Sequence, residues 1–314
     1  MTHWHAPACA AALLWVALHA TAAAPLAPLT TEEVAPGIHV HVGRIADWAE
    51  APEGDVANLT LIVGSRCAAV IDTGGTPALG LRWRATVQAL TDKPICHVIH
   101  THVHPDHILG REAFMAENAT QWSHTNLPGA LAARAPYYRA ALTREFGTTL
   151  PDTALAGPYS PVVPTQTRML DLGGRSLELR AWPTAHTNHD LTVWDAATRT
   201  LITGDLLFIT HLPALDGSLR GWIAVTDTLT GLGARTIVPG HGAVSHDAAS
   251  AFSPQAAYLA TLARETRAAI AAHQTITQAV DKVGQQAASS WQLVDAFHRR
   301  NVTTAYAELE WEDE

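Results

Sequence analysis

The chain has 314 residues, of which 47% are hydrophobic and 16% are charged, and its formal net charge is −9. This length and apolar content are sufficient for one large folded domain or two small ones. An acidic chain repels phosphate backbones, so the composition argues against nucleic acid as a partner.

Residues 1–24 have the composition of a secretory signal. Residues 8–20 are apolar and rich in Ala and Leu, and Ala20-Thr21-Ala22 offers a cleavage site between small residues. The flank carries His where Lys or Arg is usual, so the alternative is an uncleaved Ala-rich leader. The apolar stretch is shorter than the ~18 residues that a membrane-spanning helix needs. We therefore expect a periplasmic protein with one folded domain over residues 25–314, and not an integral membrane protein.

The first half of the chain alternates short apolar runs with amphipathic ones. Thr76 is placed to cap a helix that has Pro77 at its first position. In residues 38–42 apolar and polar side chains alternate, which puts His39 and His41 on a solvated face of a strand. Strands are predicted at residues 38–42, 56–63, 68–71, 95–99 and 119–124, and helices at residues 76–90, 107–116 and 127–146.

The second half of the chain repeats this plan. Residues 147–166 contain several prolines and are interpreted as an irregular connection. Strands are predicted at residues 176–182, 191–195, 199–203 and 235–238, and helices at residues 219–232 and 253–310. The alternation of strands and helices indicates an α/β protein.

Two cysteines lie at the starts of predicted strands, Cys67 before residues 68–71 and Cys96 within residues 95–99. If the two strands are parallel neighbours, an oxidising periplasm would permit a disulfide between them. We favour the simpler interpretation of two buried thiols.

The densest group of potential metal ligands is the motif His-x-His-x-Asp-His. It comprises His102, His104, Asp106 and His107 and directly follows the predicted strand at residues 95–99. Side chains alternate faces along an extended backbone, so His102 and His104 point the same way, while Asp106 and His107 lie on the turn that opens the next helix. The arrangement suits two adjacent metal ions.

Later segments supply further ligands, each just after a predicted strand: His186, Asp205 and His241. Asp72, in Val-Ile-Asp-Thr-Gly, ends another predicted strand upstream. The order and spacing of these five motifs resemble the metallo-β-lactamase superfamily of zinc hydrolases. The resemblance covers nearly all of the chain after about residue 30. It implies a four-layer αββα sandwich, with ligand loops from both halves meeting along one edge.

The resemblance also implies a binuclear site. His102, His104 and His186 would hold one metal, Asp106, His107 and His241 the other, and Asp205 would bridge them. These ligands favour two Zn²⁺ ions and are also compatible with iron or manganese. A hydroxide shared by the metals would attack the carbonyl of an ester, lactone or thioester, with Asp106 as the catalytic residue that shuttles its proton.

Other polar residues leave alternatives open. Asp72 is interpreted as orienting a ligand histidine, against a plain turn residue. His211, which follows Asp205 in the chain, is a candidate for contact with the substrate. Asn58 is either a pocket donor or an ordinary strand residue. His97 and His100 are interpreted as packing or surface residues, because the ligand set is complete without them.

A narrower resemblance comes from the segment Gly204-Asp205-Leu206-Leu207-Phe208, the segment His211–Trp222 and the Leu-Glu-Trp-Glu ending. These are similar to the quinoprotein relay system zinc metallohydrolases, exported proteins encoded beside pyrroloquinoline quinone (PQQ)-dependent dehydrogenases. The similarity implies a periplasmic role and a quinoprotein dehydrogenase as a possible partner, with a small molecule as substrate. The alternatives are a β-lactamase-type amide hydrolase and a non-catalytic metal-binding accessory.

Overall fold

The computed structural model describes residues 1–3, 27–115, 118–164 and 166–312. Most of the predicted signal, residues 4–24, therefore lies outside the described residues. Within the part of the chain that the structure describes, no helix has the length and apolar character needed to cross a membrane.

Two β-sheets form the centre of the molecule. The first sheet has the order β1-β2-β3-β4-β5-β6-β7 and the second has the order β12-β11-β10-β9-β8. The strands of the first sheet are β1 (Glu32–Ala35), β2 (Ile38–His41), β3 (Leu59–Val63), β4 (Ala68–Ile71), β5 (Ile95–Ile99), β6 (Thr120–His124) and β7 (Ser160–Val162). Those of the second are β8 (Thr167–Asp171), β9 (Ser176–Ala181), β10 (Leu191–Asp195), β11 (Thr200–Phe208) and β12 (Thr236–His241).

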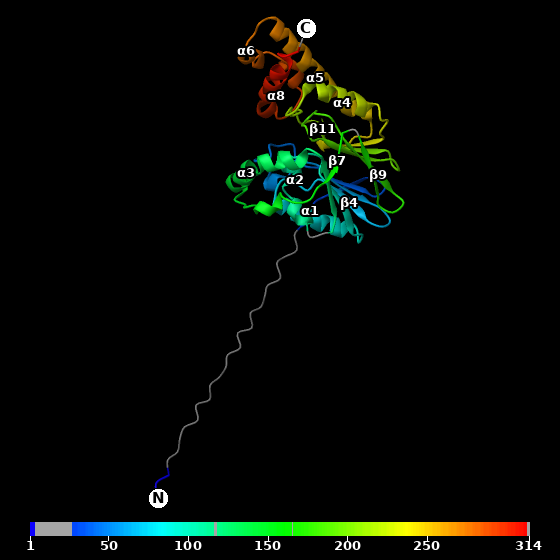
Figure 1. The fold of residues 1–314 in the computed structure, drawn as a ribbon, viewed down its shortest axis with the longest axis vertical. Helices are drawn as coiled ribbons and strands as arrows, with labels where there is room; N and C mark the ends of the chain where they lie inside the picture. Colours follow the sequence, from blue (N-terminus) through cyan, green and yellow to red (C-terminus); the bar gives the residue numbers. More distant parts are fainter. Residues whose placement is uncertain (4–26, 116–117, 165, 313–314) are drawn as a thin grey trace.

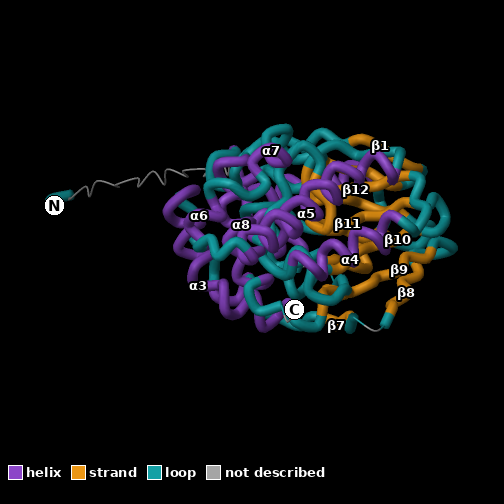
Figure 2. The backbone as a smooth tube through the Cα atoms, turned by 90° about the horizontal axis from the view of Figure 1, so that it is seen from above, coloured by secondary structure: helices purple, strands orange, loops and turns teal. Residues whose placement is uncertain are grey.

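Helices cover the outer face of each sheet (Figure 1). One side carries α1 (Pro77–Leu90), α2 (Pro105–Ile108) and α3 (Leu127–Phe146), with the short 3-10 helices η1 (Pro52–Gly54), η2 (Arg111–Phe114) and η3 (Asp152–Ala154). The other side carries α4 (Leu219–Thr230), α5 (Ala248–Ala271), α6 (Ile276–Val280), α7 (Gln285–Ala288) and α8 (Val294–Leu309). Figure 2 shows α4 and α5 lying across the strands β10 to β12.

Clusters of buried apolar side chains lie between the four layers and hold them together. Between the sheets, Ile71 and Ile99 of the first pack in one cluster with Leu179 and Val193 of the second. A second cluster joins the first sheet to α1, and a third joins the second sheet to α4, α5 and α8. The four-layer αββα sandwich predicted from the sequence is therefore confirmed.

The helix-start prediction at α1 is also confirmed in its detail. Thr76 has extended backbone, its hydroxyl accepts a hydrogen bond from the Leu79 amide at 3.2 Å, and Pro77 is the first helical residue. The predicted helix at 107–116 instead divides into α2 and η2. Gly110, between them, packs so closely on Thr73 that a Cβ there would lie 2.0 Å from the Thr73 carbonyl oxygen, so only glycine fits where α2 gives way to η2.

Several boundaries differ from the sequence prediction. β8 was not predicted, because its residues are mostly exposed on a sheet edge and give no alternating apolar pattern. β7 and η3 lie within the segment predicted to be irregular. His41 was predicted to be solvated and is buried: its ring contacts the Thr30 carbonyl and the Asp55 carboxylate, which cover that face of β2.

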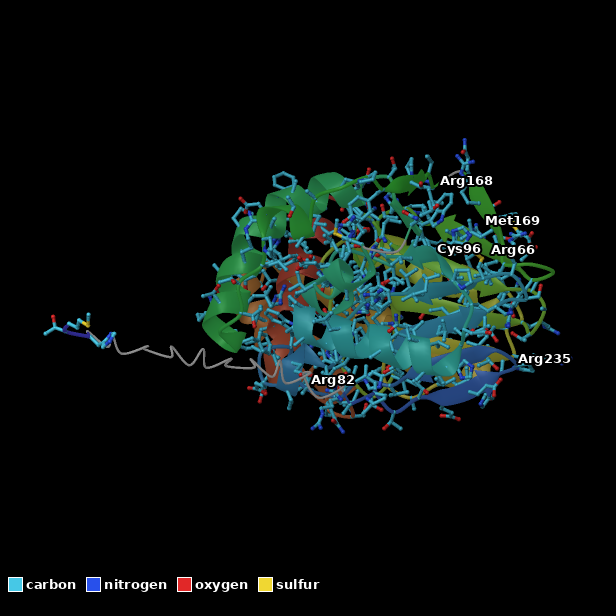
Figure 3. All side chains as sticks on the ribbon, turned by 90° about the horizontal axis from the view of Figure 1, so that it is seen from below. Arg66, Arg82, Cys96, Arg168, Met169 and Arg235 are labelled. Atoms are coloured by element: carbon cyan, nitrogen blue, oxygen red, sulfur yellow. A yellow bond between two sulfur atoms is a disulfide. The ribbon has the colours of Figure 1, made fainter. Side chains whose placement is uncertain are left out.

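The preference for two free thiols was wrong, because Cys67 and Cys96 form a disulfide with Cα atoms 5.8 Å apart. β4 and β5 are parallel neighbours, and their register skips one residue there: Ala68 pairs with Ile95 and Ala69 pairs with His97. Cys96 is the skipped residue, so the irregularity brings it beside Cys67. Figure 3 shows Cys96 close to Arg66, the residue that precedes Cys67.

Candidate metal centre

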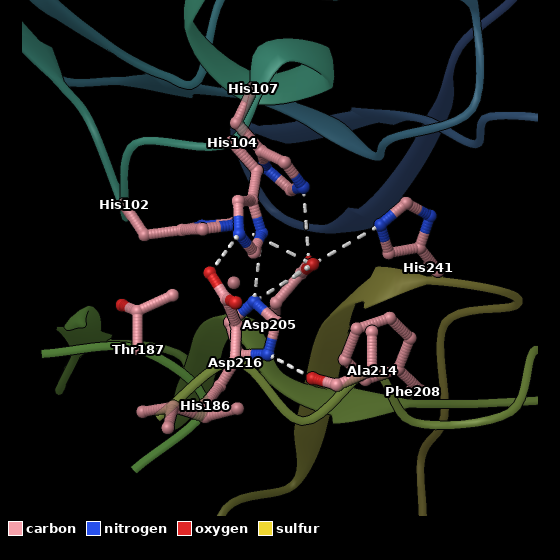
Figure 4. A network of polar contacts seen from close by, with 12 residues as sticks. His102, His104, His107, His186, Thr187, Asp205, Phe208, Ala214, Asp216 and His241 are labelled. Atoms are coloured by element: carbon pink, nitrogen blue, oxygen red, sulfur yellow. Dashed lines mark hydrogen bonds and ion pairs between the residues drawn. The ribbon is translucent and has the colours of Figure 1, made fainter. Parts of the chain in front are cut away.

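Segments from both sheets meet where their strands end (Figure 4). His102 and His104 lie on the loop between β5 and α2, and Asp106 and His107 lie on α2. His186 lies on the loop from β9 to β10, and His241 is the last residue of β12. Asp205 was expected after a strand and lies inside one, because β11 continues to Phe208.

The seven side chains form two groups. His102, His104, His186 and Asp205 make up one, and Asp106, His107 and His241 make up the other. Within each group the ligand atoms lie within 4.8 Å of one another. Asp205 reaches both groups, since its Oδ2 lies 3.5 Å from His102 Nε2 and 3.5 Å from His186 Nε2, while its Oδ1 lies 3.0 Å from His107 Nε2. Asp106 Oδ2 lies 3.2 Å from His241 Nε2.

Three of the histidines bind an acceptor through the ring nitrogen that faces away from the centre. His107 Nδ1 lies 2.8 Å from an Asp72 carboxylate oxygen, His186 Nδ1 lies 2.6 Å from the Ala214 carbonyl, and His241 Nδ1 lies 2.9 Å from the Val56 carbonyl. Carboxylate and carbonyl oxygens only accept hydrogen bonds, so each Nδ1 carries the proton. Each Nε2 lone pair is then directed into the centre.

His102 and His104 are oriented in the same manner by less direct contacts. The Thr101 hydroxyl donates to Asp72 at 2.7 Å and accepts from His102 Nδ1 at 3.1 Å. His104 is turned the other way round: its Nε2 lies 3.2 Å from Asp216 Oδ2, so its Nδ1 lone pair faces His186 Nε2 at 3.1 Å. Imidazoles fixed in this way are typical of metal ligands.

The centre also contains buried polar atoms that no protein group satisfies. Asp205 Oδ1 and His107 Nε2 lie 3.0 Å apart without hydrogen-bond geometry, and neither of them nor His102 Nε2 has a hydrogen-bond partner among the described residues. Such atoms are rare in folded proteins, because each leaves desolvation uncompensated. Five imidazoles and two carboxylates with lone pairs converging on two points fit a pair of divalent cations with nitrogen and oxygen ligands.

Asp205 and Asp106 attract positive charge to the imidazoles of the second group. Burial opposes charge on the imidazoles, but Asp205 and Asp106 outweigh it, raising the pKa of His241 to about 9 and that of His107 above its usual value. Burial lowers the pKa of His186 to about 3. The same attraction favours a divalent cation at this group, which would bind in competition with protons.

Two close approaches require glycine around Asp205. A Cβ at Gly240 would lie 1.9 Å from Asp205 Oδ1, and a Cβ at Gly204 would lie 2.6 Å from the Thr101 Cβ. Gly204 also has a positive φ of 53°, at the point where the pairing of β11 with β12 shifts register. This irregularity turns Asp205 toward the centre.

A cavity of about 500 Å³ opens beside the ligands. Its floor includes His104, Asp106, Asp205 and His241. His211, for which substrate contact was one alternative, lines it; the His211 ring lies 5.0 Å from that of His241.

Four other residues singled out in the sequence lie outside this cavity. His100 is buried against Gln121, and His97 accepts a hydrogen bond from Trp122. Asn58 donates to the Pro239 and Gly242 carbonyls on either side of His241, so it braces that turn. Asp72 contacts His107 and Thr101 and has a positive φ of 58°.

Sequence reasoning missed Asp216 and Arg134. Asp216 Oδ2 contacts His104 and also Arg134 Nη2 at 3.3 Å, linking the loop after β11 to α3. The only sequence signal at Asp216 is an acidic residue before Gly217 in a loop, which is also typical of an ordinary turn.

Comparison with known proteins gives the family. The model of the "Metallo-beta-lactamase superfamily" matches residues 52–241, more than half of the chain. Among curated proteins, a linear primary-alkylsulfatase from Pseudomonas sp. (strain ATCC 19151) is 35% identical over 68 residues, which is 22% of this chain and 10% of that enzyme.

Solved structures agree in fold. The sec-alkylsulfatase Pisa1 from Pseudomonas sp. has a TM-score of 0.65 at 18% identity, covering 90% of this chain and 51% of that one. A metallo-beta-lactamase from Hirschia baltica has a TM-score of 0.57 at 16% identity, covering 74% and 97%. The chain thus spans about half the length of the sulfatase. At these identities the likeness establishes the fold alone, whereas the family model establishes membership: the chain belongs to the metallo-beta-lactamase superfamily, a superfamily of metal-dependent hydrolases.

Proposed function

We propose that this chain is an exported binuclear zinc hydrolase that cleaves an ester, a lactone or a thioester. The observation that carries the proposal is the orientation of all five site histidines. Each binds an acceptor on its outer nitrogen and presents its other nitrogen to the centre. In a histidine cluster that only packs in a core, buried atoms such as His102 Nε2 would have hydrogen-bond partners, because buried polar atoms in folded proteins nearly always do.

When bound, two zinc ions supply Lewis acidity and lower the pKa of water. The chain's own residues supply orientation and a proton acceptor. Asp106 Oδ2 lies 3.3 Å from His107 Nε2 and 3.2 Å from His241 Nε2, and the positive charge of cations held by these groups would keep this carboxyl ionised. An ionised Asp106 on the cavity floor can accept a proton from the attacking water and return it to the leaving oxygen or sulfur.

Export is supported by two independent features. One is the apolar, Ala-rich leader at residues 1–24. The other is the Cys67–Cys96 disulfide, since disulfides persist in oxidising compartments such as the periplasm. Association with a PQQ-dependent dehydrogenase is proposed from the resemblance in sequence, and co-purification of tagged chain with such a dehydrogenase from periplasmic extract tests it.

Metal content and the Asp106→Asn variant test the hydrolase itself. The purified chain should contain about two zinc ions per molecule. Asp106→Asn should lower kcat on aryl esters and lactones by about 10²- to 10⁴-fold, because the amide cannot accept the proton. Asp92→Asn, at an aspartate whose side chain is 93% exposed, should leave kcat unchanged. Undiminished turnover by Asp106→Asn would exclude this mechanism.

Hydrolysis of alkyl sulfates is the second candidate. The likeness to the sec-alkylsulfatase extends over 90% of this chain, further than the 74% matched by the Hirschia baltica enzyme. Sulfate release from 2-octyl sulfate and from dodecyl sulfate, beside ester and lactone assays, separates the two functions. A nitrocefin assay tests the β-lactamase alternative, and the absence of all turnover in a zinc-loaded chain would favour a metal-binding accessory.

A further inference from the structure

Helix α8 forms one wall of the cavity above the metal centre. Phe297, Arg300 and Asn301 line the cavity from this helix, although the family model ends at residue 241. The ligand residues on the cavity floor thus lie within residues 52–241, which the superfamily model matches, whereas the α8 wall lies outside that range. Residues outside the matched segment are well placed to select a substrate particular to this chain.

The upper cavity has apolar and aromatic sides. Trp48, Tyr137 and Phe297 line it from three separate elements. Trp48 is held by its Nε1 hydrogen bond to the Gly75 carbonyl at 3.0 Å and by the Phe146 ring at 4.9 Å. Phe297 packs on His211, with ring centroids 4.7 Å apart. Tyr137 is 65% exposed, so its ring is accessible at the edge of this cavity. Such walls suit a substrate with an apolar body.

The charged groups around this cavity are nearly all engaged. Asp106 and Asp205 belong to the metal centre, and Asp216 is shared between His104 and Arg134. Asp47, on another wall, accepts the Ala49 amide at 3.0 Å. Arg300 differs: its exposed side chain lines both this cavity and the hollow beside α6, and no hydrogen bond or ion pair involves that side chain among the residues that the structure describes.

We propose that Arg300 binds an anionic group of the substrate, a carboxylate, while the apolar body lies between Trp48, Tyr137 and Phe297. The substrate class is then an ester or lactone that carries a free carboxylate away from the bond to be cleaved. A guanidinium forms a bidentate, charge-assisted pair with a carboxylate and is more weakly hydrated than an ammonium group. This inference rests on the proposed hydrolase function.

Arg299 provides a matched control. It is the adjacent residue on α8 and pairs with Asp281 at 3.0 Å. Both arginines line the hollow beside α6, but Arg299 does not line the cavity over the metal centre. Its substitution removes the same charge from the same helix without altering the cavity.

Binding of dicarboxylates tests the proposal without turnover. The full chain, as purified with its metal, is titrated by calorimetry with dicarboxylates from glutarate to suberate and with the monocarboxylates of equal length. At least one diacid should bind about tenfold more tightly than its monoacid. Arg300→Met should abolish that advantage, Arg300→Lys should retain part of it, and Arg299→Met should keep it in full. An advantage that survives Arg300→Met, or no advantage at any length, overturns the proposal.

Ester kinetics connect this binding to the reaction. Phenyl hydrogen adipate and phenyl hexanoate differ only in the distal carboxylate. The ratio of their kcat/KM values should fall about tenfold in Arg300→Met, through KM, and should stay unchanged in Arg299→Met. If neither ester is hydrolysed but the tighter binding of the dicarboxylate still depends on Arg300, the hydrolase function is wrong and the carboxylate-binding role of Arg300 is supported. If both esters are hydrolysed with the same ratio in every variant, the anion site fails and the hydrolase stands.

Discussion

Asp216 shows how a single residue outside the ligand set determines which atom a ligand offers. Its carboxylate keeps the proton on His104 Nε2 and so directs Nδ1 toward His186. Asp216→Ala should lower zinc affinity about 10- to 100-fold, and Asp216→Asn should lower it less, because the amide oxygen still accepts the hydrogen bond. Competition with a chromophoric chelator measures this. Asp227→Ala, at an exposed position on α4, should bind zinc as the wild type does.

Gly240 is the second single residue whose substitution should change metal binding. The space that its Cβ would need is occupied by Asp205 Oδ1. Gly240→Ala should therefore displace the carboxylate that reaches both groups of ligands and lower the zinc content below two ions per chain, as measured by elemental analysis. Gly129→Ala on α3, where a Cβ meets no atom within 4 Å, is the control. Full zinc content in Gly240→Ala would show that Asp205 is not required for the second ion.

The metal-ligand residues were predictable from the sequence, but most of the hydrogen-bond acceptors that orient them were not. His102, His186 and His241 each follow a strand signal, so their placement depends on local periodicity. The acceptors that orient them are often backbone carbonyls, such as Ala214 and Val56, whose position depends on long-range packing. Nothing in the local sequence distinguishes those carbonyls from any others.

At the scale of elements, His41 couples β2 to Asp55, the residue that follows η1. Burial lowers its pKa, but the hydrogen bonds to Asp55 and to the Thr30 carbonyl outweigh burial and raise the pKa above 6.5. A raised folded pKa stabilises the fold fully below the unfolded pKa and loses that contribution as pH rises through the folded value. The free energy of unfolding should therefore fall from about pH 6.5 upward by an amount that His41→Gln removes.

Urea unfolding at a series of pH values measures that difference. His273→Asn, at an exposed histidine beyond the end of α5, should retain the wild-type pH dependence. Asp55→Asn should flatten it as His41→Gln does, because the charge that raises the pKa is gone. Identical pH profiles for His41→Gln and wild type would mean that this contact does not favour the protonated ring.

Element boundaries were predicted best where one face is buried and the other exposed. β9 alternates exposed and buried residues, and its predicted range is within one residue of the observed one. β11 is buried along its whole length, so no alternation marks its end, and the strand runs past the predicted stop at residue 203. That extension places Asp205 inside the sheet, where a loop residue was expected.

For the whole molecule, the site exists only when the two sheets are packed together. The first sheet brings His102, His104, Asp106 and His107, and the second brings His186, Asp205 and His241. Asn58 ties the halves directly, since it precedes β3 and bonds to carbonyls 181 and 184 residues away. Metal binding and packing of the two halves are therefore thermodynamically linked, and bound zinc should stabilise the fold against unfolding.

The disulfide also affects the equilibrium between the folded and unfolded chain. It lies at the starts of β4 and β5, whereas the metal centre lies beyond the ends of these strands. Cys67 and Cys96 are 29 residues apart and enclose β4, α1 and the start of β5. Closing a loop of this size should contribute about 3–4 kcal/mol to the free energy of unfolding by restricting the unfolded chain. The double variant Cys67→Ala, Cys96→Ala should lose that amount in urea unfolding. A phosphine reductant should destabilise the wild type by a similar amount and leave the double variant unchanged. Equal stability of the double variant and the oxidised wild type would mean that the cross-link does not stabilise the fold by restricting the unfolded chain.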